Sequence, residues 1–183
     1  MRTIGWLMLT LAFLAASVLL VAWPDLKELM HARIWNVSRS DDNETNLNGV
    51  RIFIDEGRAM ILPAMDDRAL IYLRLGLQGE PSVLESWMAC DIGLTDGNGH
   101  TWRPLINQAG LEIIDMLGAD SDVDDNCDQS LLFATSADAP SLSVQAFLVP
   151  VGALNDLRLQ FAAMTTRPDA VSIPFRPVLR PPA

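Results

Sequence analysis

The first pattern along the chain is a long apolar run. Residues 4–23 contain no charged side chain and only two hydroxyl side chains. At about 1.5 Å of rise per residue, a helix of this length reaches about 30 Å, the thickness of the hydrocarbon core of a bilayer. Trp6 and Trp23 lie near the two ends, where an indole ring suits the membrane–water interface. The pattern predicts a transmembrane anchor over residues 1–24, in contact with the cell membrane through residues 4–23.

Two other structures have apolar runs of this kind, a cleaved signal peptide and a buried core helix. A signal peptide has an apolar region of about 7–15 residues, followed by a small-x-small cleavage site. The small-x-small sets of this chain, such as 15–17, fall inside the apolar run rather than after it. The uncleaved anchor is therefore the preferred interpretation, and both alternatives stay open.

Helical spacing of apolar residues continues after Pro24 and then stops. Residues 26–37 carry apolar side chains three or four positions apart, which predicts a short amphipathic helix. Residues 38–48 are polar, contain turn formers and show no apolar period, as is typical of a linker. We therefore predict a juxtamembrane helix and a polar linker over residues 25–48.

From residue 50 onwards the apolar period becomes two, which is the period of a β-strand. Short apolar or alternating runs recur every ten or so positions, with turn residues between them, as in an all-β sandwich or barrel. The predicted strands are 50–55, 58–64, 69–79, 86–95, 101–105, 111–117, 129–136, 142–150, 157–164 and 170–178. We expect one β domain over residues 49–178, followed by a proline-rich tail over residues 179–183.

The alternation in two of these runs predicts which side chains face the core. The expected inward residues are Ile71, Leu73, Leu75 and Leu77 in one run, and Leu157, Leu159 and Phe161 in the other. The residues expected to face water are Arg74, Arg158 and Gln160.

Residues 86–102 predict a β-hairpin. Met88, Cys90, Ile92 and Leu94 form one apolar face of its first strand. The residues Asp-Gly-Asn-Gly at 96–99 accept the backbone conformations that a tight reversal requires. A cation loop is the alternative for these side chains, but the later ligands of a calcium loop do not appear at their spacing.

The chain has two cysteines, Cys90 and Cys127. They do not form a C-x-x-C pair, and two cysteines alone cannot supply a four-cysteine zinc site. A disulfide is the simplest use for them, on the condition that the domain lies outside the cytoplasm, because a reducing cytosol keeps thiols free. A bridge between positions this far apart stabilises a domain by roughly 4 kcal/mol in the entropic model.

The charge of the chain is strongly negative, with 13 Lys and Arg against 23 Asp and Glu. Such a body repels nucleic-acid phosphates, which excludes a nucleic-acid partner. The acidic run 115–128 has alternating carboxylates at Asp120, Asp122 and Asp124, followed by Asp125. The position that requires glycine in a calcium loop is Asp125, so the motif fails and a solvated acidic loop is expected. Weak binding of a divalent cation by these four aspartates is the alternative.

Catalytic motifs are not found in the sequence. It has no G-x-S-x-G elbow, H-E-x-x-H helix or phosphate-binding glycine loop, and its two histidines are His31 and His100. The carboxylates gather in loops, without an apolar flank to raise a pKa. We expect a protein that is not an enzyme and that has no cofactor.

The run 69–102, followed by Cys127 and residues 147–161, resembles the immunoglobulin-like, telokin-like domains of unknown function in bacterial secreted and membrane-anchored proteins. The resemblance covers about residues 69–161. The matching positions are Leu94, Asp96, Gly99 and Trp102 in the hairpin, and Val149, Pro150, Leu157, Leu159 and Phe161 near the last strand. It implies a mainly β, immunoglobulin-like antiparallel β-sandwich, preceded here by one transmembrane helix. It supplies no catalytic residue, no ligand and no disulfide.

These patterns together predict a single-pass protein of the inner (cytoplasmic) membrane with a periplasmic C-terminal domain. The count of Lys and Arg beside the apolar run opposes this orientation, because Arg2 precedes the run whereas Lys27, Arg33 and Arg39 follow it. The acidic domain and the cysteines favour it. The expected role is that of an interaction or structural module that binds another envelope protein. The alternative is a small-ligand or cation-binding domain that uses the acidic loop 115–128.

Overall fold

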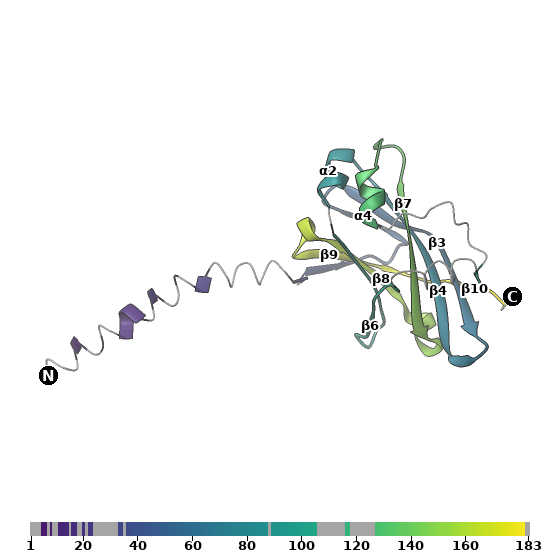
Figure 1. The fold of residues 1–183 in the computed structure, drawn as a ribbon, viewed down its shortest axis with the longest axis horizontal. Coiled ribbons are helices and arrows are strands. Elements are labelled where there is room, and N and C mark those ends of the chain that lie inside the picture. The colour runs from purple at the N-terminus through teal and green to yellow at the C-terminus, as the bar shows by residue number, and fades with distance from the viewer. Residues whose placement is uncertain are drawn as a thin grey trace.

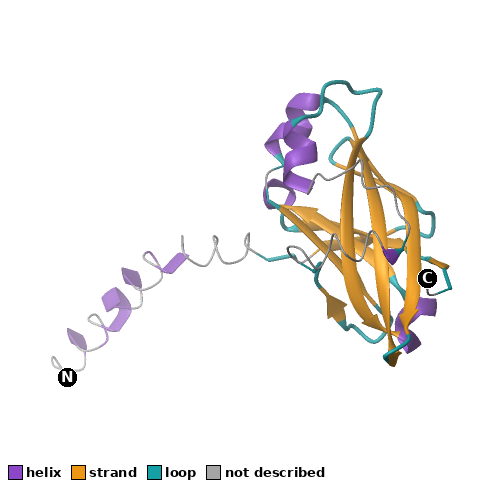
Figure 2. Cartoon of the chain, turned by 45° about the vertical axis from the view of Figure 1, so that its right-hand side comes forward, coloured by secondary structure: helices purple, strands orange, loops and turns teal. Residues whose placement is uncertain are grey.

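The computed structural model describes residues 33, 34, 36–87, 89–105, 116, 117 and 127–181, together with positions 5, 6, 8, 11–14, 16, 17, 20, 22 and 23. Within these residues the chain is mainly β, and its strands form two five-stranded sheets (Figure 1). Figure 2 shows the two layers of strands, with short helices at their ends.

The first sheet, which we call sheet A, has the strand order β1-β9-β8-β5-β6. Its strands are β1 (Asn36–Arg39), β9 (Asp169–Pro174), β8 (Arg158–Ala163), β5 (Cys90–Thr95) and β6 (Thr101–Trp102). The second sheet, sheet B, has the order β10-β3-β4-β7, and β2 also pairs with β3. Its strands are β10 (Val178–Leu179), β3 (Val50–Leu62), β4 (Met65–Gln78), β7 (Ser141–Pro150) and β2 (Glu44–Leu47).

Four short helices join the strands within the described residues. They are α2 (Pro81–Ser86), α4 (Cys127–Leu132), and the 3-10 helices η1 (Val151–Asp156) and η2 (Met164–Thr166). The hydroxyl of Thr165 in η2 donates to the carbonyl of Ser86 at the end of α2, at 3.0 Å. We call the end of the sandwich that carries α2, α4 and η2 the helical end (Figure 1).

The prediction of an antiparallel sandwich holds for most strand pairs and is wrong for two edge strands. β1 lies parallel to β9, and β10 lies parallel to β3. The amide of Asn36 donates to the carbonyl of Pro168 at 3.2 Å, so β1 starts at the helical end, where β9 also starts. The two strands therefore run in the same direction.

The core between the sheets consists of the residues that the alternation predicted to face inward. They are Ile71, Leu73, Leu75, Leu77, Leu157, Leu159 and Phe161, all buried in one cluster. Each fully buried side chain of this size stabilises the fold by about 1.5–3 kcal/mol relative to exposure. The predicted inward faces are therefore confirmed.

The predicted strand 129–136 is wrong, because Cys127–Leu132 forms helix α4. This helix buries Cys127, Ser130 and Leu131, which lie three and four positions apart and so share one helical face. The runs 50–55 and 58–64 also differ from expectation, because they form the single strand β3 with a register shift between Ile54 and Glu56.

The polar segment predicted as a linker contains strands. β1 falls partly within residues 38–48, and β2 falls wholly within it. All four residues of β1 are exposed, so an edge strand of this kind has the polar composition of a linker. Val37 lies in β1 rather than in the predicted juxtamembrane helix, and residues 26–32 and 35 of that helix lie outside the described residues. The predicted strand 111–117 lies outside them too, apart from residues 116 and 117.

The N-terminal positions that the structure describes, between residues 5 and 23, are helical and exposed. Among the described residues, no helix has the length and apolar character that a membrane crossing requires. The other positions of the predicted anchor, residues 4, 7, 9, 10, 15, 18, 19 and 21, lie outside the described residues.

Candidate functional site

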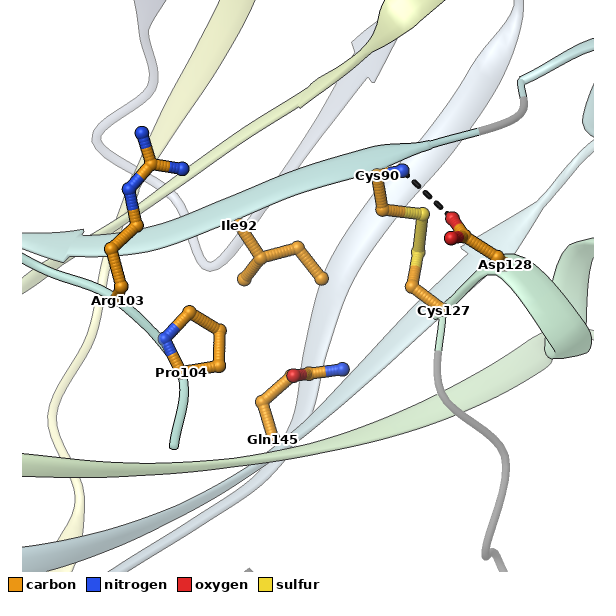
Figure 3. A pocket seen from close by; sticks show the side chains of 7 residues that line it. All are labelled: Cys90, Ile92, Arg103, Pro104, Cys127, Asp128 and Gln145. Atoms are coloured by element: carbon orange, nitrogen blue, oxygen red, sulfur yellow. Dashed lines mark hydrogen bonds between the residues drawn. A yellow bond between two sulfur atoms is a disulfide. The ribbon is translucent and has the colours of Figure 1, made fainter. Parts of the chain in front are cut away.

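A pocket opens at the side of the sandwich, between β5 of sheet A and β7 of sheet B (Figure 3). Its volume is about 480 Å³, within the range of about 300–1,000 Å³ that small-molecule sites have. The residues that line it are Cys90, Ile92, Arg103, Pro104, Cys127, Asp128 and Gln145.

The right side of this pocket in Figure 3 is a disulfide between Cys90 and Cys127. The two Cα atoms lie 6.1 Å apart, and the cysteines are separated by 37 positions in the sequence. The bridge ties the first residue of β5 to the first residue of α4. The predicted pairing of the two cysteines is therefore confirmed.

Asp128 reinforces the same junction. Its Oδ1 accepts a hydrogen bond from the backbone amide of Cys90 at 2.8 Å (Figure 3). The residue also lies in the first turn of α4, where a carboxylate interacts favourably with the positive end of the helix dipole. Asp128 therefore acts as a structural link between the helix and β5.

Arg103 lies at the rim of the pocket and pairs with Asp91 rather than with the pocket interior. Its Nη1 donates to Oδ1 of Asp91, and Nη2 of Arg167 donates to Oδ2 of the same carboxylate at 3.1 Å. Figure 3 shows the guanidinium of Arg103 turned away from Gln145. Asp91 is thus held between two arginines on the outward side of β5.

The pocket lining combines apolar groups with the amide of Gln145 and the carboxylate of Asp128. The Nε2 of Gln145 donates to the hydroxyl of Ser143 at 3.1 Å. The other interior surface comes from Ile92, Pro104 and the disulfide. The lining residues include no histidine, no free thiol and no hydroxyl, so they can hold an apolar group but offer no nucleophile with an adjacent base.

A second pocket of about 340 Å³ lies near the edge of the sandwich. Its lining residues are Asp41, Asn43, Ile54, Pro174, Phe175 and Arg176. It mixes both charges without a convergent set of polar groups.

The hairpin predicted at 96–99 is present between β5 and β6, and Asp96 is its organising residue. Asp96 Oδ1 accepts hydrogen bonds from the amides of Asn98 at 3.0 Å and His100 at 2.8 Å. Its Oδ2 lies 2.8 Å from Nδ1 of His100. The hydrogen bond from the His100 ring lowers the pKa of Asp96 to about 2, from a usual value of 3.8.

These contacts give Asp96 and Asn98 the role of turn formers. Gly99 has a φ of 84°, which a glycine adopts without strain, and its amide donates to the carbonyl of Asp96 at 3.2 Å. Among the described residues, no group of three or more histidine, cysteine or acidic side chains is placed to hold a metal ion. Asp120, Asp122, Asp124 and Asp125, the alternative cation ligands, lie outside the described residues.

Sequence reasoning found the cysteines and the hairpin but missed the charge cluster at Asp91. The alternation of β5 places Asp91 opposite the core face, and that signal was available. Its partner Arg167 is 76 positions away, and only the strand order of sheet A brings the two together.

Neither a protein-family model nor a curated protein matches the sequence. Two solved structures are similar in fold, and both are of proteins described as a putative lipoprotein. The first, from Staphylococcus aureus subsp. aureus NCTC 8325, is 8% identical with a TM-score of 0.43, over 77% of this chain and 94% of its own. The second, from Bacillus subtilis subsp. subtilis str. 168, is 10% identical with a TM-score of 0.43, over 75% of this chain. The chain spans 39% of the length of that second protein.

Proposed function

We propose that this protein is a membrane-tethered, extracytoplasmic β-sandwich that binds another protein of the cell envelope. The observation that carries the proposal is the disulfide between Cys90 and Cys127. Disulfides form and persist in oxidising compartments and are rare where glutathione and thioredoxin keep thiols reduced. The bridge therefore favours a domain outside the cytoplasm, although the Lys and Arg count beside the apolar run opposes this orientation.

The fold in this proposal is an immunoglobulin-like sandwich, in keeping with the resemblance to telokin-like domains over residues 69–161. The support is the strand order. With β3, β4 and β7 taken as strands A, B and E, and with β5, β8 and β9 taken as C, F and G, each strand has its expected neighbours. The disulfide differs from that of antibody domains, since it joins the start of C to the helix before E.

The membrane tether in this proposal is the apolar run of residues 4–23. Its support is the sequence, together with the exposure of its described side chains. Trp6 is 71% exposed and Leu20 is 77% exposed. A helix that is apolar on all sides needs an apolar environment, which a bilayer supplies.

An interaction role is preferred to catalysis because of the chemistry at the pocket. Among the described lining residues, the one carboxylate, that of Asp128, accepts a hydrogen bond from a backbone amide, and the two cysteines are joined. His100 lies on the hairpin tip, where its ring engages Asp96. Sites of this kind suit binding, and loops and strand edges on a rigid sandwich commonly carry it.

Thiol labelling of intact cells tests the compartment. We expect a membrane-impermeant maleimide to label Cys90 and Cys127 only after a reductant is added, because both thiols are joined and lie outside the cytoplasm. A Cys90→Ser variant is the control, since its unpaired Cys127 should be labelled without reductant. Two free thiols that react only after cell lysis would overturn the proposal.

A pull-down from detergent-solubilised membranes tests the partner. We expect the full chain to recover one envelope protein in near-equal amount, and the Cys90→Ser variant with its destabilised fold to recover less. If the pull-down recovers no protein in near-equal amount, the result would count against the interaction role. The compartment would still be decided by the labelling experiment.

A further inference from the structure

Sheet A has one face in the core and one face outside. Ile92, Leu159 and Val171 are buried in the core cluster, so the residues that alternate with them point away from it. We call this side the outer face of sheet A. Its members are Val37, Arg39, Asp91, Gly93, Thr95, Thr101, Arg103, Arg158, Gln160, Ala162, Arg167, Ala170 and Ser172.

The charge of the outer face is opposite in sign to that of the protein. Its members include four arginines and one acidic residue, which gives a formal charge of +3 from 4 − 1. The whole chain has a formal charge of −10. Nearly a third of the positive side chains, four of 13, therefore lie on this one sheet face with a single carboxylate.

The arginines at the two edges of the face are the accessible ones. Arg103, beside β6, has a side chain that is 70% exposed. Arg39, in β1 at the opposite edge, is exposed and has no ion-pair partner within the described part of the chain. The inner two are held in place: Arg167 is 26% exposed and pairs with Asp91, and Nε of Arg158 donates to the hydroxyl of Ser172 at 2.9 Å.

The centre of the face consists of small side chains. Gly93, Ala162, Ala170 and Ser172 occupy neighbouring strands there. All four are buried, with Ala162 at 0%, Ala170 at 1% and Ser172 at 4% exposure, so longer side chains cover them. A guanidinium presents donors in a fork that matches a carboxylate, so the exposed arginines at the two edges of the face can recognise acidic side chains.

We propose that the outer face of sheet A binds an acidic, extended segment of a partner protein. Strands β1 and β6 are four strand spacings apart, which is about 19 Å at about 4.8 Å per spacing. An extended segment rises about 3.3 Å per residue, so carboxylates about six residues apart reach Arg39 and Arg103 together. The proposal deepens the proposed function and rests on it for the kind of partner.

The choice of a protein segment as the occupant rests on the proposed function, in which the partner is another envelope protein. An anionic lipid surface offers the same negative charge, so the experiment below includes it as a competing probe.

The acidic side chains of sheet B leave this face attractive to an anion. Sheet B lies about 10 Å behind sheet A, and exposed charges more than about 8 Å apart are largely screened at physiological salt. A bound acidic segment therefore interacts with the arginines of the outer face and only weakly with the carboxylates on the far side.

Binding of an acidic peptide to the full chain tests the proposal. The full chain is placed in nanodiscs of uncharged phosphatidylcholine, and the probe is a fluorescent peptide of about 12 residues with glutamates about six positions apart. The matched probe has glutamine in place of glutamate. We expect saturable binding of the acidic probe, measured by anisotropy, that weakens as salt rises from about 50 to 300 mM, and at least about tenfold weaker binding of the glutamine probe.

Substitutions assign the binding to this face. Arg39→Gln and Arg103→Gln should each weaken binding about two- to fivefold, as expected for one exposed ion pair, and the double variant about tenfold. Arg51→Gln removes the same charge from sheet B and should change binding less than twofold. Arg39→Lys and Arg103→Lys keep the charge without the fork, so each should bind the probe more weakly than the unchanged protein and more tightly than the matching glutamine variant. Circular dichroism confirms that each variant is folded.

Three outcomes would overturn the proposal: no saturable binding of the acidic probe, an equal loss in Arg51→Gln, or binding of phosphatidylglycerol vesicles in preference to the peptide. The last would assign the face to lipid. Peptide binding is measured on the isolated protein, so it does not depend on the compartment in which the protein lies. Failure of the peptide to bind would not change the labelling result, and a labelling result that indicates the cytoplasm would not change the measured peptide binding.

Discussion

Asp96 shows how one carboxylate organises the reversal between β5 and β6. Its two oxygens accept the amide hydrogens of Asn98 and His100 and contact the His100 ring. Gly97 directly follows Asp96, and its backbone amide donates to Oδ2 of Asp156 in η1 at 2.8 Å. The loop is thus fixed both within itself and to η1.

We predict that Asp96 titrates near pH 2 in the folded protein and that His100→Ala raises the pKa of Asp96 towards 3.8. Because folding lowers this pKa, the stabilising contribution of Asp96 is present above about pH 4 and is lost as the pH falls to about 2. NMR titration of the aspartate carboxyl carbons measures the value directly. Asn98→Ala, which removes a weaker contact at 3.4 Å, should shift the pKa of Asp96 less than His100→Ala does. An unchanged pKa in His100→Ala would contradict the assigned cause.

The role of a single residue was predictable from the sequence where that role depends on residues close to it in the chain. Asp96 and Gly99 were identified because a tight reversal needs them, and Cys90 and Cys127 because there was no third cysteine to pair with either. Arg39, Arg103, Arg158 and Arg167 could not be grouped, because they lie in four separate segments of the chain that only the strand order brings together. The charge cluster at Asp91 was missed for the same reason.

The junction of β5 with α4 is the element whose stability depends most on a covalent link. The disulfide and the bond from the Cys90 amide to Asp128 both join these elements. Helix α4 has only six residues, and helices this short are not stable on their own. Its position therefore depends on β5.

We predict that the double variant Cys90→Ser and Cys127→Ser lowers the free energy of unfolding by about 2–4 kcal/mol, because the unfolded chain regains the freedom that the bridge removes. Urea denaturation with circular dichroism measures the change. Reduction of the wild-type protein should give a loss of similar size, and reductant should not affect the variant. Equal stability of the oxidised protein and the variant would show that the bridge contributes nothing.

Strand β3 bends beside the aromatic ring of Phe175. A Cβ atom on Gly57 would overlap this ring, which is 1% exposed. The ring is part of the buried core cluster, so it can turn away from an added methyl group only by displacing its neighbours.

We predict that Gly57→Ala lowers the free energy of unfolding by about 1–3 kcal/mol, as overpacking of a filled core does. Gly152→Ala is the matched control, because no atom lies within 4 Å of its added methyl group, and it should change stability by less than about 0.5 kcal/mol. Thermal and chemical denaturation compare the two. Equal stability of both variants would mean that β3 shifts at its register irregularity between Ile54 and Glu56 and so makes room for the methyl group.

Element boundaries were predictable where alternation is strong and continuous. β4, β7 and β8 match the runs 69–79, 142–150 and 157–164, apart from shifts of a few residues at their ends. α4 was missed because the run 129–136 is short and apolar, and such runs fit a strand or a helix equally well. β1 was missed because all four of its residues are exposed, and β2 because it has only four residues, of which Leu47 alone is apolar and buried.

The acidic segment 115–128 bears on the whole molecule, because a cation site there would give the protein a different function. We predict that calcium raises the melting temperature by less than about 1 °C, since the segment departs from the calcium-loop spacing. Differential scanning calorimetry with and without calcium measures the shift. If a larger rise occurs and disappears when Asp120, Asp122, Asp124 and Asp125 are changed to asparagine, the cation-binding alternative is correct.

The parallel pairing of β1 with β9 has a mechanical consequence for a tethered protein. Residues 36–39 lie beside residues 169–172 in one register, and the N-terminal side of β1 leads back to the apolar run. A pull along the axis of β1 would load the hydrogen bonds between the two strands together in shear, rather than opening them one after another. The resistance of this attachment therefore depends on the direction of the pull.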